Sequence, residues 1–229
     1  MENISTRKRI EEDLALLKSM IYRMNSLVAE SLEKSVHVLK NRDVASAELL
    51  IEDGDAVDDL EDKIDTACME FAARYQPLGE DLRTVVSFMH IAVDLERIGD
   101  YSESIAKVTI STAKMPQLKP LIDIPRMVKI ITEMLRICMT SIDAHDGEAV
   151  KQVFPLDDDV DDLEQQIMRE LMLLIMERPE RIEHSFELMN VAKTLERAGD
   201  HVTNIAERIA YMCTGTPVKA SDYRRRKKF

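Results

Sequence analysis

The amino-acid sequence predicts an all-α fold of two tandem three-helix bundles related by a pseudo-twofold axis. Composition is the first reason: 45% of the 229 residues are hydrophobic and 32% are charged, the ordinary balance of a soluble globular protein. With 6 Gly, 7 Pro and 4% aromatic residues, the chain is poor in the turn-forming residues that a β-sandwich or barrel needs. Periodicity is the second reason, because apolar residues recur at three- and four-residue steps along most of the chain.

The first half of the chain shows three apolar stripes, each of which predicts a helix. The first stripe runs from Leu14 to Leu39 and breaks at Asn41-Arg42-Asp43. The second runs from Ala47 to Phe71 and is closed by Gln76-Pro77-Leu78-Gly79, since Pro and Gly together stop a helix. The third runs from Leu82 to Ile105.

A proline-rich segment from Met115 to Pro125 is the best linker in the chain. After it the helical pattern resumes and predicts helices over 127–145, 146–177 and 180–213, with Pro179 as the stop between the last two. We therefore divide the chain into a first repeat (1–114), a second repeat (115–215) and a basic, flexible tail (216–229). The tail's basic run, 224–228, favours a solvated end; contact with an acidic partner or a membrane surface is the alternative.

An internal repeat is the third reason for the predicted fold. Leu95-Glu96-Arg97-Ile98-Gly99-Asp100 returns as Leu195-Glu196-Arg197-Ala198-Gly199-Asp200, and Val57-Asp58-Asp59-Leu60-Glu61 returns as Val160-Asp161-Asp162-Leu163-Glu164. Order and spacing agree for both blocks, which indicates a duplicated unit. Short connections between long helices favour up-and-down packing within each unit.

Charge and motif content exclude several functions. The net charge of −12 argues against nucleic-acid binding, and no apolar run approaches the roughly 20 residues that span a bilayer, so we expect no membrane insertion. Three widely spaced cysteines in apolar patterns indicate reduced thiols and a cytoplasmic protein. The long, Met-rich helices favour a homodimer. The sequence lacks the common catalytic motifs and the Glu-x-x-His pairs of ferritin-like di-iron sites, so we expect no enzymatic activity.

Carboxylates at helical spacing are the most informative feature. Glu96 and Asp100 share one helix face, and so do Asp58, Glu61 and Asp65. If the second and third helices of a repeat pack side by side, these faces converge into a cluster suited to Mg, Mn, Fe or Zn. The alternative is a solvated acidic face. The duplication favours the metal. Gly99 and Gly199, which are costly inside a helix, indicate the close approach of another helix or of a metal cluster, and close packing alone would explain them too.

The duplicated Leu-Glu-Arg-x-Gly-Asp motif, with a Val-Asp block upstream of each copy, resembles the PhoU family of phosphate-signalling regulators. Gln76-Pro77 followed by Asp81-Leu82-Arg83 is similar to that family too, and the resemblance covers about residues 10 to 213. It implies a PhoU-like fold of six long antiparallel helices and a non-enzymatic, metal-binding adaptor. It also implies negative regulation of phosphate uptake and phosphate-starvation signalling, with the ATPase subunit of a phosphate ABC transporter and a PhoR-type sensor histidine kinase as partners.

The resemblance also implies two multinuclear metal clusters, of iron or zinc, with manganese or magnesium as alternatives. The matching ligands are Asp58, Glu61, Asp65, Glu96 and Asp100 in the first repeat, and Asp157, Asp161, Glu164, Glu196 and Asp200 in the second. The second repeat departs from the pattern, since Met168 stands opposite Asp65 and Arg181-Ile182-Glu183 replaces Asp-Leu-Arg. A helical interaction scaffold without metal and a carboxylate-bridged metalloenzyme are the two competing hypotheses.

Overall fold

The computed structural model describes residues 2–225, with side chains from Thr6 onward. Within that range the chain is helical and contains no β-strand, which confirms the all-α prediction. The α-helices are α1 (Glu2–Asn41), α2 (Val44–Glu52), α3 (Asp55–Tyr75), α4 (Gly79–Thr112), α5 (Asp123–Ala144), α6 (Val153–Glu177) and α7 (Ile182–Thr214). Short 3₁₀-helices lie at Ala149–Gln152, Pro179–Arg181 and Ala220–Asp222.

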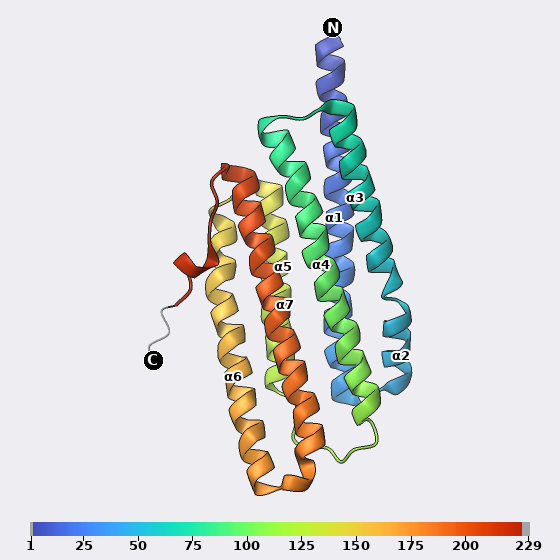
Figure 1. The fold of residues 1–229 in the computed structure, drawn as a ribbon, viewed down its shortest axis with the longest axis vertical. Coiled ribbons are helices and arrows are strands. Elements are labelled where there is room, and N and C mark those ends of the chain that lie inside the picture. The colour runs from blue at the N-terminus through green and yellow to red at the C-terminus, as the bar shows by residue number, and fades with distance from the viewer. Residues whose placement is uncertain (1, 226–229) are drawn as a thin grey trace.

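The helices form two bundles whose helix connections lie at opposite ends of the molecule. Helices α1, α3 and α4, with the short α2, make the first bundle, and α5, α6 and α7 make the second. The α3–α4 connection lies at one end of the molecule and the α6–α7 connection at the other (Figure 1). Helices α4 and α7 pack against each other at the centre, and α1 also contacts α5. This arrangement confirms the predicted pair of three-helix bundles.

One continuous hydrophobic core runs through both bundles. Ile21, Ile98, Ile131 and Ile205 are fully buried, come from four different helices and belong to the same core. Each lies on an apolar stripe that the 3.6-residue period places on one face of its helix. Because the core is shared, the two bundles hold α4 and α7 in fixed positions relative to each other.

The second predicted helix is not continuous, contrary to the expectation from its apolar stripe. It is divided at Asp53-Gly54 into α2 and α3. Asp43 starts α2, since its side chain accepts a hydrogen bond from the backbone N–H of Ser46 at 3.1 Å. At the break, the Gly54 N–H donates to the carbonyl of Ile51 at 3.3 Å. The break brings the start of α3 onto α4.

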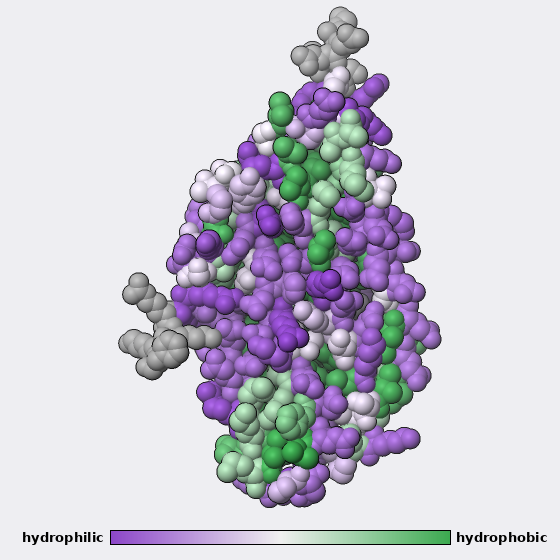
Figure 2. Space-filling model, in the orientation of Figure 1, coloured by the Kyte–Doolittle hydropathy of each residue, from purple (hydrophilic) through white to green (hydrophobic). Residues whose placement is uncertain are grey.

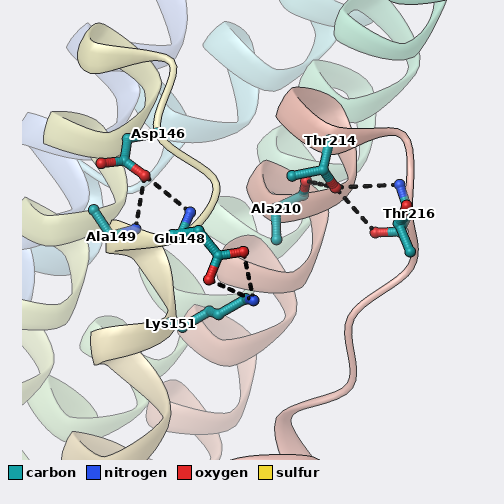
Figure 3. Close-up of polar contacts among 7 residues, drawn as sticks. All are labelled: Asp146, Glu148, Ala149, Lys151, Ala210, Thr214 and Thr216. Carbon is teal, nitrogen blue, oxygen red and sulfur yellow. Dashed lines mark hydrogen bonds and ion pairs between the residues drawn. The ribbon is translucent and has the colours of Figure 1, made fainter.

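Two turns at one end of the second bundle set the direction of α6 and of the chain after α7 (Figure 3). The Asp146 carboxylate accepts hydrogen bonds from the backbone N–H groups of Glu148 and Ala149, both at 2.9 Å, and so caps the turn that leads into α6. The Thr214 hydroxyl donates to the carbonyl of Ala210 at 2.8 Å and accepts from the N–H of Thr216 at 3.2 Å.

After Gly215 the chain turns back beside α6 (Figure 1). We call residues 216–225 the C-terminal segment; the sequence places them in a flexible tail. In the structure the Ala220 N–H instead donates to the Glu207 carboxylate at 2.7 Å, and the rings of Tyr223 and Phe154 lie 5.5 Å apart. The remaining residues of the predicted tail, 226–229, lie outside the described residues.

The surface is mostly hydrophilic, with a hydrophobic area where α6 and α7 meet (Figure 2). Large apolar side chains are exposed on these two helix ends, among them Met176, Ile182 and Phe186. Within residues 2–225, no helix combines the length and the hydropathy of a membrane span.

Candidate metal centre

Three carboxylates converge in the first repeat, where α3 packs on α4. Asp58 from α3 and Glu96 and Asp100 from α4 each place an oxygen within 4.8 Å of the other two. Among the side chains that the structure describes, no other group of three potential ligands comes this close. We call these three residues the first carboxylate cluster. The sequence-predicted convergence of Asp58, Glu96 and Asp100 is therefore present.

Gly99 explains how the two helices approach so closely. A Cβ atom at Gly99 would lie 3.3 Å from Cγ1 of Val57, which is tighter than an ordinary van der Waals contact. Val57 precedes Asp58, and Gly99 precedes Asp100. The absent side chain lets the helices meet at the level of the cluster, so close packing accounts for the glycine.

The carboxylates of the cluster repel one another, although the Asp100 side chain is 44% exposed and solvent screens part of the repulsion. Burial, followed by repulsion from Asp100, raises the pKa of both Asp58 and Glu96. Burial, and then repulsion from its neighbouring aspartates, also raises the pKa of Glu61. Arg97 lies 3.5 Å from Glu96 and 3.6 Å from Asp100, but its side chain is 55% exposed and these contacts are long. A bound divalent cation would relieve the remaining repulsion.

Glu103 is a further carboxylate that sequence reasoning missed. A cavity of about 10 Å³, close to the space for one water-sized group, is lined by Asp58, Asp100 and Glu103. The signal was present in the sequence, since 96, 100 and 103 follow the i, i+4, i+7 spacing of one helix face. Gly54 makes room for Glu103, because a Cβ at Gly54 would lie 1.8 Å from the Glu103 Oε1 atom.

The first carboxylate cluster suits a hard divalent cation. Its donors are all carboxylate oxygens, the ligands that Mg²⁺ and Mn²⁺ prefer. Opposite ligands of such an ion lie about 4.2 Å apart, at bond lengths of about 2.1 Å, so small side-chain rotations would suffice. Two predicted ligands stand outside the cluster: Glu61 lies near enough to Glu96 to affect its pKa, and Asp65 lies a further helical turn along α3.

The second repeat is arranged differently, because a guanidinium group lies between its carboxylates. Arg224 Nη2 donates to Asp157 on α6 and to Asp200 on α7, the latter at 3.0 Å. The adjacent Arg225 backbone N–H donates to Asp158, and the Arg225 guanidinium lies 2.8 Å from Asp159. The sequence gives no local sign of these contacts, since Arg224 follows Asp157 by 67 residues.

The other predicted ligands of the second repeat also lie near cations. Lys193 Nζ lies 2.8 Å from Glu196 Oε2, and Glu164 acts on the pKa of the same lysine. Asp161, the counterpart of Asp58, raises the pKa of Arg224. We call Asp157, Asp161, Glu196 and Asp200 the second carboxylate cluster. Within the described side chains, its members do not form a three-carboxylate group as close as the first.

Among the carboxylates that the structure describes, Asp157 has the most strongly raised pKa. Its side chain is 1% exposed, and burial raises its pKa to about 7 although the Arg224 charge acts in the opposite direction. One oxygen, Oδ1, has no hydrogen-bond partner. That oxygen lies 2.7 Å from where a Cβ at Gly199 would stand, so the second motif glycine admits a carboxylate as well as a neighbouring helix.

A histidine links the two repeats between the clusters. His201 Nδ1 lies 2.8 Å from Asp94 Oδ1, and Tyr101 Oη lies 3.3 Å from His201 Nε2. Tyr101 and His201 follow the two motif aspartates, so the pseudo-twofold brings equivalent positions together. The contact positions α4 against α7.

Comparison with known proteins gives a consistent match over almost the whole chain. The PhoU domain family matches residues 21–109 and 124–209. A phosphate-specific transport system accessory protein PhoU homologue from Aquifex aeolicus is 36% identical over 92% of this chain and 96% of its own length. Its counterpart from Deinococcus radiodurans is 34% identical over 92% of this chain and 99% of its own length.

Two solved structures share the fold. The crystal structure of PhoU from Pseudomonas aeruginosa matches with a TM-score of 0.85 and 28% identity, over 90% of this chain and 99% of that one. The phosphate transport system regulatory protein PhoU from Streptococcus pneumoniae matches with a TM-score of 0.85 and 26% identity, over 92% and 99%.

Gly54→Ala tests whether Glu103 belongs to the first carboxylate cluster. Gly54 has ordinary helical dihedrals, so we expect alanine to leave stability unchanged or to raise it by up to about 1 kcal/mol. The new methyl group would displace the flexible Glu103 carboxylate, and we expect Mn²⁺ affinity to fall about tenfold. A Mn²⁺ titration of Gly54→Ala, Glu103→Gln and the double variant measures this. Unchanged affinity in Gly54→Ala, or fully additive losses, would contradict it.

Asp157→Asn tests the perturbed carboxyl group of the second repeat. In metal-free buffer native Asp157 keeps its proton up to about pH 7, whereas an unfolded aspartate loses it near pH 3.9. The native state then binds more protons than the unfolded state, so the free energy of unfolding falls between about pH 4 and pH 7, relative to the variant. Urea unfolding of both proteins across this range measures the difference; a difference that stays constant or rises with pH sinks the assignment.

Proposed function

Because this chain belongs to the PhoU family, we propose that it is a non-enzymatic accessory regulator of phosphate transport. Support comes from the relatives, which are named as accessory proteins of the phosphate-specific transport system and align over nearly their full length. We infer a negative regulator, which restrains phosphate uptake and phosphate-starvation signalling when phosphate is plentiful. This direction is the one that the duplicated motif implied through its resemblance to the family.

We propose that a divalent cation binds in the first carboxylate cluster and holds α3 against α4. The observation that carries this proposal is the convergence of Asp58, Glu96 and Asp100 within 4.8 Å of one another. An all-oxygen donor set favours magnesium or manganese over zinc, which more often takes histidine or cysteine ligands. Iron or zinc in a multinuclear cluster, as the resemblance implies, stays a prediction.

We propose the ATPase subunit of the transporter and a PhoR-type sensor kinase as partners, in the cytoplasm. The exposed apolar side chains where α6 and α7 meet, among them Met176 and Phe186, support a role in protein contacts, including a homodimer. In this role the cation shapes the bundle from which docking surfaces are presented. A helical scaffold without metal would offer the same surfaces, so the function of the first cluster needs a direct test.

Complementation tests the regulator and its cation together. Deleting the gene in its own organism is expected to raise phosphate uptake in phosphate-rich medium, and the wild-type gene should restore restraint. The variant Asp58→Asn/Glu96→Gln/Asp100→Asn keeps the shape of the cluster but loses the charge that attracts a cation, so we expect it to fail. Phosphate uptake and the cellular level of each protein are the measurements.

A matched control removes three exposed carboxylates that lie outside the cluster, Glu48→Gln/Asp59→Asn/Glu70→Gln. It changes net charge by the same amount, and we expect it to restore restraint. If the deletion leaves uptake unchanged, the regulatory proposal is wrong. If the cluster variant restores restraint as well as the control does, the scaffold without metal is the better account.

A further inference from the structure

The second carboxylate cluster already contains a cation, and the chain itself supplies it. Arg224 Nη2 contacts Asp157 and Asp200, the residues that face each other from α6 and α7. Its positive charge lies against Asp200, the counterpart of Asp100 in the first cluster, and is also attracted by Asp161, the counterpart of Asp58. Arg97, the nearest guanidinium in the first repeat, makes longer contacts from a more exposed position.

The C-terminal segment is built to deliver this arginine. Ala220 is buried and its N–H donates to the Glu207 carboxylate, while Tyr223 packs on Phe154. Lys151 Nζ also lies 5.1 Å from the centre of the Tyr223 ring. These contacts precede Arg224 in the chain and aim it at the cluster.

The guanidinium is an imperfect partner for this site. Asp157 Oδ1 has no hydrogen-bond partner although the side chain is 1% exposed, and the Arg224 Nε–H is also buried without a partner. Each unpartnered buried polar group costs about 1–3 kcal/mol. A planar, directional donor satisfies one Asp157 oxygen and leaves the other unmet. A small spherical cation accepts lone pairs from any direction and can bind oxygens that the guanidinium leaves unpaired.

We propose that Arg224 is an internal cation that closes the second carboxylate cluster, and that a divalent cation enters this cluster only by displacing the C-terminal segment. The inference rests on the metal-binding part of the proposed function. Two consequences follow. The two clusters bind cations unequally, the first directly and the second in competition with Arg224. Cation binding and release of the segment are also linked, so each favours the other to the same extent.

Mn²⁺ binding tests the competition directly. In a Glu96→Gln/Asp100→Asn background the first cluster is disabled, and the loss of free Mn²⁺ signal in electron paramagnetic resonance reports the second. Adding Arg224→Gln should tighten this binding at least about tenfold, because apparent affinity is reduced by the fraction of molecules in which the site is open. Arg178→Gln, at the opposite end of α6 and exposed, is the matched control for loss of one positive charge.

Trypsin cleavage after Arg224 tests the displacement. The protease must take the Arg224 side chain into its own pocket, which the contacts with Asp157 and Asp200 prevent. In the same background, Mn²⁺ should therefore accelerate cleavage at this bond, followed by intact mass, and leave unchanged the cleavage after Lys114, which is exposed in the connection between α4 and α5. Mn²⁺ bound at the second cluster with no change in cleavage after Arg224 would overturn the proposal.

The outcomes separate this inference from the proposed function. If Arg224→Gln binds Mn²⁺ no more tightly than Arg178→Gln, the internal-cation proposal is wrong, whatever the first cluster binds. If the wild-type first cluster binds no Mn²⁺ while Arg224→Gln opens the second, the internal cation is supported and the metal role of the first cluster fails. If no variant binds Mn²⁺ at all, both proposals are wrong.

Discussion

Where α3 packs on α4, and again where α6 packs on α7, carboxylates from two helices are brought within a few ångströms of each other. Their repulsion and desolvation disfavour the same helix contacts that the apolar stripes favour. At each site the charge is either spread over partly exposed carboxylates or balanced by an arginine. In the first repeat, three carboxylates remain close together, and the pKa values of Asp58 and Glu96 are raised. In the second repeat, Arg224 donates hydrogen bonds to both Asp157 and Asp200. The two halves thus meet one constraint in two ways.

The two sites differ through a pair of complementary exchanges between the repeats. Gly54 in the first repeat stands where Asp157 stands in the second, and Glu103 stands where Thr203 stands. The first repeat therefore receives an added carboxylate from α4, and Gly54 leaves the space for it. The second repeat receives its added carboxylate from α6, and Gly199 leaves the space for it. The two sites contain a similar number of acidic groups, but the added carboxylate of the second site is more deeply buried than that of the first. Burial therefore raises the pKa of Asp157 to about 7.

Much of the architecture could be predicted from the sequence because it follows from local rules. Apolar periodicity predicted the long helices. The Pro and Gly of Gln76-Pro77-Leu78-Gly79 predicted a helix end, and α3 does end at Tyr75. The duplicated motif predicted that Asp58, Glu96 and Asp100 would converge, since it fixes which helix faces meet. The break at Gly54 was not predicted, because the apolar stripe continues in phase across it. The contacts of Arg224 were not predicted either, since they join residues distant in the chain and depend on how the segment after Gly215 folds back.

The central claim is that the first carboxylate cluster holds a divalent cation while Arg224 holds the place of one in the second. Anomalous X-ray diffraction from crystals of the wild-type chain grown with Mn²⁺ tests both halves in one experiment. The account predicts an anomalous peak bounded by Asp58, Glu96 and Asp100, with the Arg224 guanidinium between Asp157 and Asp200. No peak at the first cluster, or a peak in the second beside an undisplaced Arg224, would contradict it.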